Sequence, residues 1–184
     1  NYDEVQEIIE TGSGKYNAEI KCLNYMAKNF RKERLKNGAI NFSSTEVKFQ
    51  LDETGKPLGI VVKESKESHQ LVEEFMLLAN RTVAAHVAKI KLNKKPVPFP
   101  YRVHDTPDDE KLKPLAAFAK KFGYNFDIHD EAAIAASFIQ LMIVVHGKPE
   151  QHVLKQLVVG PMAKTIYTMV NVGNYGLGLK VYCH

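Results

Sequence analysis

Apolar residues recur at helical spacing over most of the chain, interrupted by stretches in which they alternate with polar ones. A period of about 3.6 indicates an amphipathic helix, and a period of about two indicates a strand. The predicted helices span residues 2–11, 16–36, 67–92, 108–122, 130–145 and 150–169. The predicted strands are 39–51 and 58–62, which the turn signal "DETGKP" joins, and 177–183. The pattern therefore predicts an α+β fold, mainly helical with a small antiparallel sheet.

Two stretches conflict with this periodicity. In "VVGPMAK", Gly160 and Pro161 fall inside a helical pattern, where a proline costs about 3 kcal/mol and a glycine about 1 kcal/mol. We expect a break or kink there. The prolines of "NKKPVPFPY", residues 93–101, predict an extended connector after the helix that precedes them.

Composition is that of an ordinary soluble protein. The chain has 184 residues, of which 45% are hydrophobic and 25% charged, enough for one globular unit with a substantial core. The formal net charge of +4 permits an anionic partner without arguing for one. Positive charge is concentrated in residues 28–36 and in Lys89, Lys91, Lys94 and Lys95, where solvated surface is the ordinary interpretation.

Cysteine usage and the chain ends bear on location. Cys22 and Cys183 are far apart and form no CxxC motif, which is typical of a reducing compartment. The sequence shows neither a signal peptide nor an apolar run of about 18 residues, so we predict a cytoplasmic protein with no membrane partner. The chain starts at Asn1 rather than Met and stops at His184 inside a strand-like pattern, so we expect a piece of a longer domain.

The central predicted helix contains "VEEFMLLANRT", residues 72–82, in which two acids interrupt an otherwise apolar pattern. At about 100° per residue, Glu73 and Asn80 share one narrow stripe, whereas Glu74 lies about 100° away, in line with Arg81. One interpretation is structural: the acids form the solvated edge and Glu74 pairs toward Arg81. The other is functional: Glu73 and Asn80 face a polar ligand, since a carboxylate and an amide can bind ribose hydroxyls.

No catalytic motif is present. The sequence lacks GxSxG, GxxxxGK[ST] and GxGxxG, so an α/β-hydrolase, a P-loop nucleotide triphosphatase or a Rossmann enzyme has no local support, and no histidines stand at HExxH spacing. Asp105, Asp108 and Asp109 in "HDTPDDE", and "HDE" at 129–131, are typical of helix N-termini rather than of metal sites. We therefore predict no catalytic residue and no metal ligand in this chain.

Five segments together resemble one family. They are "YDEVQEII" at 2–9, "GAINF" at 38–42, "VEEFMLLAN" at 72–80, "YRVHDTPDDEKL" at 101–112 and "NYGLGLKVYCH" at 174–184. In this order and spacing they resemble the central part of the catalytic domain of the ribonuclease II and ribonuclease R family of 3′ to 5′ exoribonucleases, with the strongest resemblance to bacterial ribonuclease R.

The resemblance implies a fold and a chemistry. In that family a mainly helical domain surrounds a channel for single-stranded RNA, four aspartates hold Mg²⁺, and an arginine assists processive hydrolysis to nucleoside 5′-monophosphates. The aspartates would precede Asn1 and the arginine would follow His184. Residues 1–184 would thus be a central segment of an exoribonuclease II-type catalytic domain, with Mg²⁺ in the parent enzyme and none bound by this chain.

The resemblance also implies RNA contacts. Tyr2 and a helix glutamate would select ribose over deoxyribose, and Glu73 is favoured over its rival Glu74 because it shares a stripe with Asn80. Phe42 would stack on a base. The full set of residues expected to contact RNA is Tyr2, Phe42, Glu73, Glu74, Asn80, Arg102, His104, Tyr182 and His184.

Two hypotheses follow. The first is the RNA-channel portion of a hydrolytic 3′ to 5′ exoribonuclease, inactive as an isolated chain and expected to self-associate through apolar surfaces, notably an unpaired edge strand at 176–182. The alternative is a non-catalytic RNA- or protein-binding scaffold module. Gly160, Pro161 and Asn174 depart from the family pattern and favour the alternative.

Overall fold

The computed structural model describes residues 1–40, 46–63 and 65–184, with only the backbone for residues 46–48, 62 and 63. Its helices make up about half of the chain, and its strands form small antiparallel pairs, which confirms the predicted fold class. Where the length suggests one globular unit, the chain divides into two compact units: residues 1–32 with 42–77, and residues 33–41 with 78–184. The two units are described separately.

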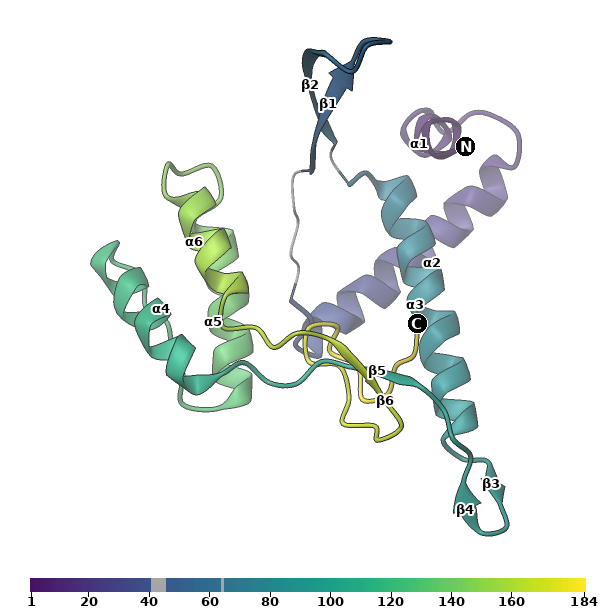
Figure 1. The fold of residues 1–184 in the computed structure, drawn as a ribbon. Helices are drawn as coiled ribbons and strands as arrows, with labels where there is room; N and C mark the ends of the chain where they lie inside the picture. Colours follow the sequence, from purple (N-terminus) through teal and green to yellow (C-terminus); the bar gives the residue numbers. More distant parts are fainter. Residues whose placement is uncertain (41–45, 64) are drawn as a thin grey trace. The chain divides into compact units, whose positions relative to one another are not determined.

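Three helical segments and a hairpin make up the first unit (Figure 1). Helix α1 spans Tyr2–Thr11, and α2 begins at Asn17 and extends to Lys36. Helix α3, Glu67–Val87, contributes its first half. Helix α1 begins with a capping box between Asn1 and Glu4 and ends at Gly12, whose φ of 69° a glycine adopts without strain. The loop "TGSG" therefore separates the first two helices as predicted.

Polar contacts and one aromatic contact join α2 to α3 within the first unit. Glu67, at the start of α3, accepts a hydrogen bond from Asn24 at 2.9 Å and pairs with Lys28 at 2.9 Å. Further along, the rings of Phe30 and Phe75 meet edge to face with centroids 5.8 Å apart. These contacts fix the face that α3 turns toward α2.

The predicted hairpin is present as strands β1, Glu46–Leu51, and β2, Pro57–Lys63. The register pairs Phe49 with Ile60 and becomes irregular between Gln50 and Leu51. The turn follows from Asp52, whose carboxylate accepts hydrogen bonds from the backbone of Thr54 and Lys56, both at 2.9 Å. Residues 39 and 40, which the alternation placed in a strand, form none.

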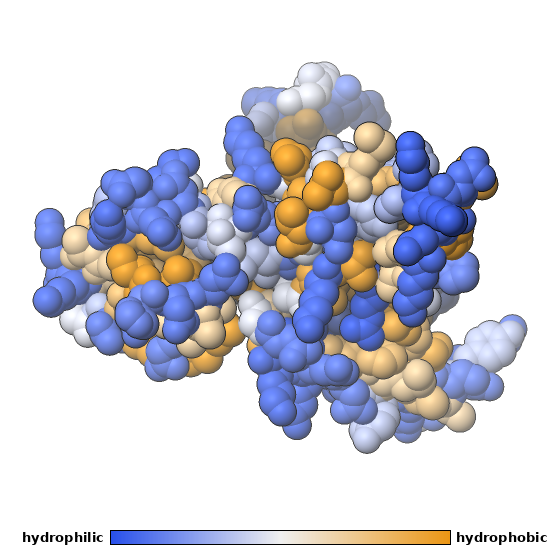
Figure 2. Space-filling model, turned by 90° about the horizontal axis from the view of Figure 1, so that it is seen from below, coloured by the Kyte–Doolittle hydropathy of each residue, from blue (hydrophilic) through white to orange (hydrophobic). Residues whose placement is uncertain are grey.

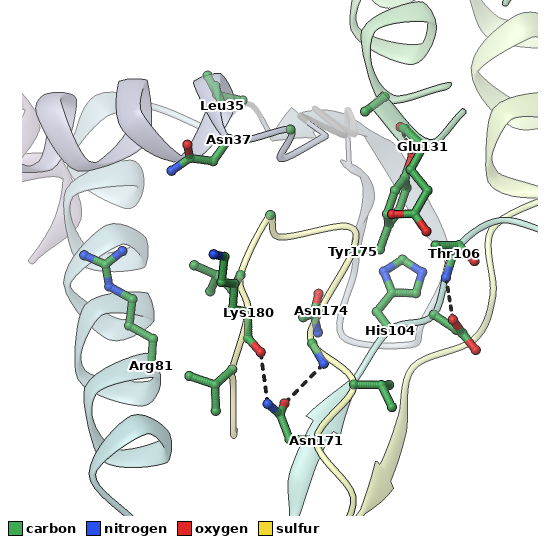
Figure 3. A pocket seen from close by; sticks show the side chains of 18 of the residues that line it. Leu35, Asn37, Arg81, His104, Thr106, Glu131, Asn171, Asn174, Tyr175 and Lys180 are labelled. Carbon is green, nitrogen blue, oxygen red and sulfur yellow. Dashed lines mark hydrogen bonds between the residues drawn. The ribbon is translucent and has the colours of Figure 1, made fainter. Parts of the chain in front are cut away.

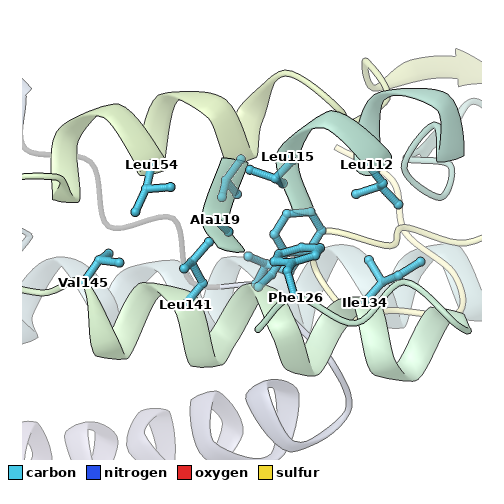
Figure 4. Close-up of a cluster of buried hydrophobic side chains, with 11 residues drawn as sticks. Leu112, Leu115, Ala119, Phe126, Ile134, Leu141, Val145 and Leu154 are labelled. Atoms are coloured by element: carbon cyan, nitrogen blue, oxygen red, sulfur yellow. The ribbon is translucent and has the colours of Figure 1, made fainter. Parts of the chain in front are cut away.

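The main core belongs to the second unit, where α4, Asp109–Lys121, α5, Glu131–Val144, and α6, Gln151–Val159, pack together (Figure 4). Helices α4 and α5 begin at Asp108 and Asp130, whose carboxylates accept backbone N–H groups of Glu110 and Ala133. The largest fully buried side chains between the helices are Leu112, Phe138, Leu141, Val145, Leu154 and Val158.

The second unit also contains two short strand pairs. Strand β5, Tyr101–Val103, pairs with β6, Ile166–Thr168, so the three helices lie between two strands that meet (Figure 1). The other pair is β3, Lys91–Leu92, with β4, Lys95–Pro96. The stretch predicted as a simple extended connector thus begins with a short hairpin, and α3 ends at Val87, earlier than the predicted residue 92.

Two predictions for the C-terminal part are wrong. The expected break at Gly160 and Pro161 is present, but the helix does not resume after it, and β6 follows instead. Residues 177–183 form no strand: Asn174 makes isolated bridges to His104 and Leu179, and the rest is turns and loop. The edge strand expected at 176–182 is therefore absent. In the described part of the chain, no helix has the length and apolarity that a bilayer crossing requires.

Candidate functional site

In the first unit, Tyr2 lies against the face of α3 that bears Glu73. The Tyr2 ring stacks on His69, with centroids 4.4 Å apart and an interplanar angle of 14°. His69 precedes Glu73 by four positions and so shares its helix face. Gln6 accepts a hydrogen bond from the backbone N–H of Ser68 at 3.0 Å, which holds α1 to the start of α3. The Tyr2 ring therefore contacts the residue one helical turn before Glu73.

The two adjacent acids have different environments. The Glu74 side chain is 2% exposed, and its carboxylate lies 3.4 Å from the guanidinium of Arg31 on α2. The Glu73 side chain is 46% exposed and lies 3.8 Å from the same guanidinium. The expectation that Glu74 lies on a solvated edge is therefore wrong, because the turn from Glu73 to Glu74 directs Glu74 toward α2. Its carboxylate forms an ion pair with Arg31, within the same unit.

In the second unit, four of the residues expected to contact RNA form one hydrogen-bonded group. Arg102 lies 3.1 Å from Nδ1 of His184, and the Tyr182 hydroxyl lies 3.2 Å from the same nitrogen. The Asn80 side-chain amide donates to the Tyr182 hydroxyl at 3.2 Å. Since arginine can only donate, Nδ1 of His184 is the acceptor, which assigns the ring proton to Nε2. We call Asn80, Arg102, Tyr182 and His184 the C-terminal polar cluster.

Backbone contacts hold this cluster in place. The N–H of Arg102 donates to the carbonyl of Tyr182 at 3.0 Å, and the Asn174 side chain donates to the carbonyl of Arg102 at 3.2 Å. The Cys183 thiol donates to the carbonyl of Asn80 at 3.4 Å, and burial raises the pKa of that thiol. Segment 173–184 is thus joined to both β5 and α3. The cluster presents a guanidinium and an imidazole that are partly exposed.

His104 has a structural partner. Its Nδ1 accepts the backbone N–H of Gly176 at 3.0 Å, and its ring meets Tyr175 edge to face. A Cβ on residue 176 would lie 2.5 Å from that nitrogen, so the close approach requires glycine. Burial lowers the pKa of His104, although a hydrogen bond to the backbone of Ala163 opposes the shift. His104 is therefore neutral near pH 7 and positions the C-terminal segment.

An open cavity of about 1640 Å³ lies within the second unit (Figure 3). Its walls come from the end of α2, the second half of α3, residues 104–106, the start of α5 and residues 171–181. Its charged lining residues are Lys36, Arg81, Lys89 and Lys180 against Asp105 and Glu131. Because cations predominate, the cavity suits an anionic group.

Comparison with known proteins identifies the family. The signature of the RNB domain matches residues 1–184, the whole chain. The chain belongs to the RNB domain family. This is the family of the ribonuclease R type of 3′ to 5′ exoribonucleases, so the resemblance in sequence is confirmed.

The relatives of this RNB chain are longer proteins. It is 34% identical over 187 residues to ribonuclease R of Chlamydia pneumoniae, covering all of this chain and 26% of that protein. The solved structure of Mycoplasma genitalium RNase R in complex with ribose methylated single-stranded RNA matches the fold with a TM-score of 0.83 and 22% identity, over 100% of this chain and 29% of that one. Yeast Ssd1, described as a pseudonuclease, matches with a TM-score of 0.66 and 17% identity, over 100% and 22%. The RNB chain spans between 12% and 27% of the length of the curated relatives that it matches.

The acidic residues of the RNB chain have structural partners. Among the described residues, no three histidine, cysteine or acidic side chains gather to hold a metal ion. Asp108 caps α4 as predicted, and Asp105 accepts the N–H of Thr106 at 2.8 Å. Within the described part of the chain, these acids therefore do not form a Mg²⁺ site.

Sequence reasoning placed some residues and missed others. Phe42 lies outside the described residues. Three residues that make hydrogen bonds with the expected contact residues were not predicted to do so. Thr165 accepts a hydrogen bond from Arg102 at 3.4 Å, and the other two are Arg31 and Asn174. No local signal marks them, because each acts on a residue at least 43 positions away in sequence.

Proposed function

We propose that this RNB chain supplies RNA contacts in the channel of a hydrolytic, processive 3′ to 5′ exoribonuclease that releases nucleoside 5′-monophosphates. The observation that supports it is the C-terminal polar cluster, in which residues separated by up to 104 positions meet around a partly exposed guanidinium. Arginine suits phosphate through charge and bidentate geometry, and tyrosine and asparagine supply hydroxyl and amide groups for ribose. Membership of the RNB domain family supports RNA as the proposed substrate class.

Tyr2 and Glu73 form a second proposed contact, for ribose hydroxyls. Glu73 is favoured over Glu74 because its carboxylate is partly exposed, whereas the Glu74 carboxylate is buried against Arg31. His104 has a weaker case for direct RNA contact, since its ring nitrogen already accepts the N–H of Gly176. In a full-length enzyme, Glu73→Ala should weaken discrimination of RNA from DNA, and Phe42→Ala should weaken binding of both, because stacking ignores the 2′-hydroxyl.

The chain alone should not hydrolyse RNA. In the parent enzyme Mg²⁺ would supply charge stabilisation and an activated water, held by residues other than those described here. The test is incubation of purified chain with Mg²⁺ and an end-labelled oligoribonucleotide. Intact substrate after hours is the expected result, and EDTA-sensitive release of mononucleotides would contradict it.

RNA binding is tested directly by fluorescence anisotropy. The chain should bind a labelled single-stranded RNA, and Arg102→Gln should weaken binding and reduce the slope of log K against log salt by about 0.7, the value for one lost phosphate contact on a single strand. Lys113→Gln is the matched control, because Lys113 lies on α4 and pairs with Glu110 at 2.8 Å. Equal loss in both variants would refute a specific role for Arg102.

The alternative is a non-catalytic scaffold module. Asn174, which departs from the family pattern, is buried and makes hydrogen bonds with Arg102 and Leu177, so it has a structural role. The fold does not separate the two functions, since yeast Ssd1 shares it and is described as a pseudonuclease. Nuclease assay of a full-length protein containing this chain distinguishes them: Mg²⁺-dependent release of mononucleotides supports the enzyme.

Exposed apolar side chains support self-association of the isolated chain. On the face drawn in Figure 2, apolar side chains reach the surface in several places. Strongly exposed examples are Leu58 and Ile60 on β2, and Met169, Val170 and Val172 after β6. Light scattering should report oligomers, and a monomer that binds no hydrophobic dye would argue against this.

The free thiols of Cys22 and Cys183 suit the cytoplasm, where we place the protein.

A further inference from the structure

The β3–β4 hairpin is a short, defined element at the end of α3. Lys91 pairs with Pro96 and Leu92 with Lys95, so only Asn93 and Lys94 form the turn. Their φ angles are 51° and 65°, both left-handed, as a type I′ turn requires. The turn therefore fixes the direction in which the hairpin side chains project.

Three lysines lie on this hairpin, and a fourth, Lys89, lies just before it. Lys89, Lys91, Lys94 and Lys95 are all exposed, and none of the four makes an ion pair with any residue that the structure describes. Residues 88–100 contain no acidic residue. Other lysines differ: Lys28 pairs with Glu67 at 2.9 Å. Lys91, Lys94 and Lys95 lie on one short hairpin, so their like charges repel one another. The hairpin is thus a concentrated positive surface that is complementary to a polyanion.

This surface continues into the cavity of the second unit. Lys89 lines the cavity together with Arg81, Lys36 and Lys180. Asn80 lies on the same helix, and at about 1.5 Å per residue the end of α3 is about 10 Å beyond it. An RNA strand a few nucleotides long could therefore reach from the C-terminal polar cluster to the start of the hairpin. Charge of one sign along such a path suits a phosphate backbone.

We propose that the β3–β4 hairpin, with Lys89, is a second RNA-backbone contact, separate from the C-terminal polar cluster. The inference rests on the proposed function for the nature of the anion. Lysines act as point charges, so the contact is to phosphates and is independent of base sequence. An anionic membrane is the less favourable partner, because only Ile90 and Leu92, 41% and 68% exposed, offer apolar side chains on this element.

The test compares two variants with the same total charge. One carries K89Q, K91Q, K94Q and K95Q, and the control carries K111Q, K113Q, K120Q and K121Q on α4. Each substitution set removes four positive charges from a chain with a formal net charge of +4, so both variants are formally neutral. Circular dichroism checks the fold, and the milder pair K91Q and K95Q serves if the fourfold variant does not fold.

Anisotropy with a long and a short labelled single-stranded RNA gives the readout. For the long RNA, the hairpin variant should lose at least about tenfold in affinity, and its salt slope should fall by up to about 3, since each phosphate contact contributes about 0.7. The control should change affinity less than about twofold. A short RNA that reaches only the polar cluster should bind the hairpin variant nearly as well as the unmodified chain.

The outcomes separate the two proposals. Equal long-RNA binding by the hairpin variant and the unmodified chain, with Arg102→Gln still weakened, overturns the hairpin contact and leaves the proposed function standing. If the unmodified chain binds no RNA, both proposals fail. Binding of the chain to phosphatidylserine vesicles that is lost in the hairpin variant, with RNA binding unchanged, also overturns the inference.

Discussion

Glu74 should be required for stability, whereas its neighbour Glu73 should not. At 3.4 Å from Arg31, an effective dielectric constant of about 20 gives an attraction of about 5 kcal/mol, which desolvation of both groups largely offsets. Glu74→Gln removes the attraction but leaves Arg31, 18% exposed, without its nearer carboxylate. Breaking a buried pair costs about 3 to 5 kcal/mol. Because Glu73 remains 3.8 Å from Arg31, we expect a loss of about 2 to 3 kcal/mol.

The assay is urea unfolding followed by far-ultraviolet circular dichroism. Glu73→Gln is the matched control and should cost no more than about 1 kcal/mol, because its pair with Arg31 is half exposed. Replacing both partners, Arg31→Met with Glu74→Leu, should recover part of the loss, since an apolar pair leaves no charge buried. If Glu74→Gln cost less than about 0.5 kcal/mol, or Glu73→Gln cost as much as Glu74→Gln, the assignment of Glu74 to the α2–α3 contact would be refuted.

Three further perturbations test other parts of the second unit. Phe138→Ala removes a fully buried ring from the three-helix core and should cost about 3 to 5 kcal/mol in thermal unfolding. Gly176→Ala should displace His104 from its hydrogen bond, seen as faster amide exchange in segment 173–179; unchanged protection would contradict the contact. The lowered pKa of His104 means that the unfolded chain binds the proton more readily. The contribution of His104 to stability should therefore be constant above the ordinary pKa of 6.5 and fall as pH drops below it, and His104→Gln should remove that fall.

Locally determined elements could be predicted from the sequence. The helices that became α1, α2, α4 and α5 were placed to within about a residue at most ends, because apolar period and capping residues such as Asp108 and Asp130 are local signals. The turn of the β1–β2 hairpin was found for the same reason, from the Asp52 and Gly55 signal.

Elements with distant partners could not be predicted. Residues 177–183 alternate like a strand, yet Gly178 is left-handed and packs close to the backbone of Ala39, and the carbonyl of Tyr182 accepts from Arg102. Such contacts depend on chain segments that periodicity does not describe. The burial of Glu74 is of the same kind, because Arg31 is 43 positions away in sequence.

The candidate site was predicted in part. Asn80, Arg102, Tyr182 and His184 were proposed through the family resemblance, and the structure brings these four together. Whether they bind RNA remains a prediction. The basic cavity was not anticipated, because its cations come from separate parts of the chain. Lys36 and Lys89 belonged to two different visible clusters, and Arg81 and Lys180 belonged to none.

The pairing of β5 with β6 has a consequence for how this chain can vary. Val103 and Ile166 are direct partners in the β5–β6 pair. The segment that contains the three helices therefore begins and ends at neighbouring positions. Apart from Ile40, the buried members of that helical core all lie between residues 112 and 158. The three helices are therefore a segment whose two ends adjoin each other and which supplies most of its own core. Such a segment can be exchanged, lengthened or shortened in related genes while the strands on either side keep their register.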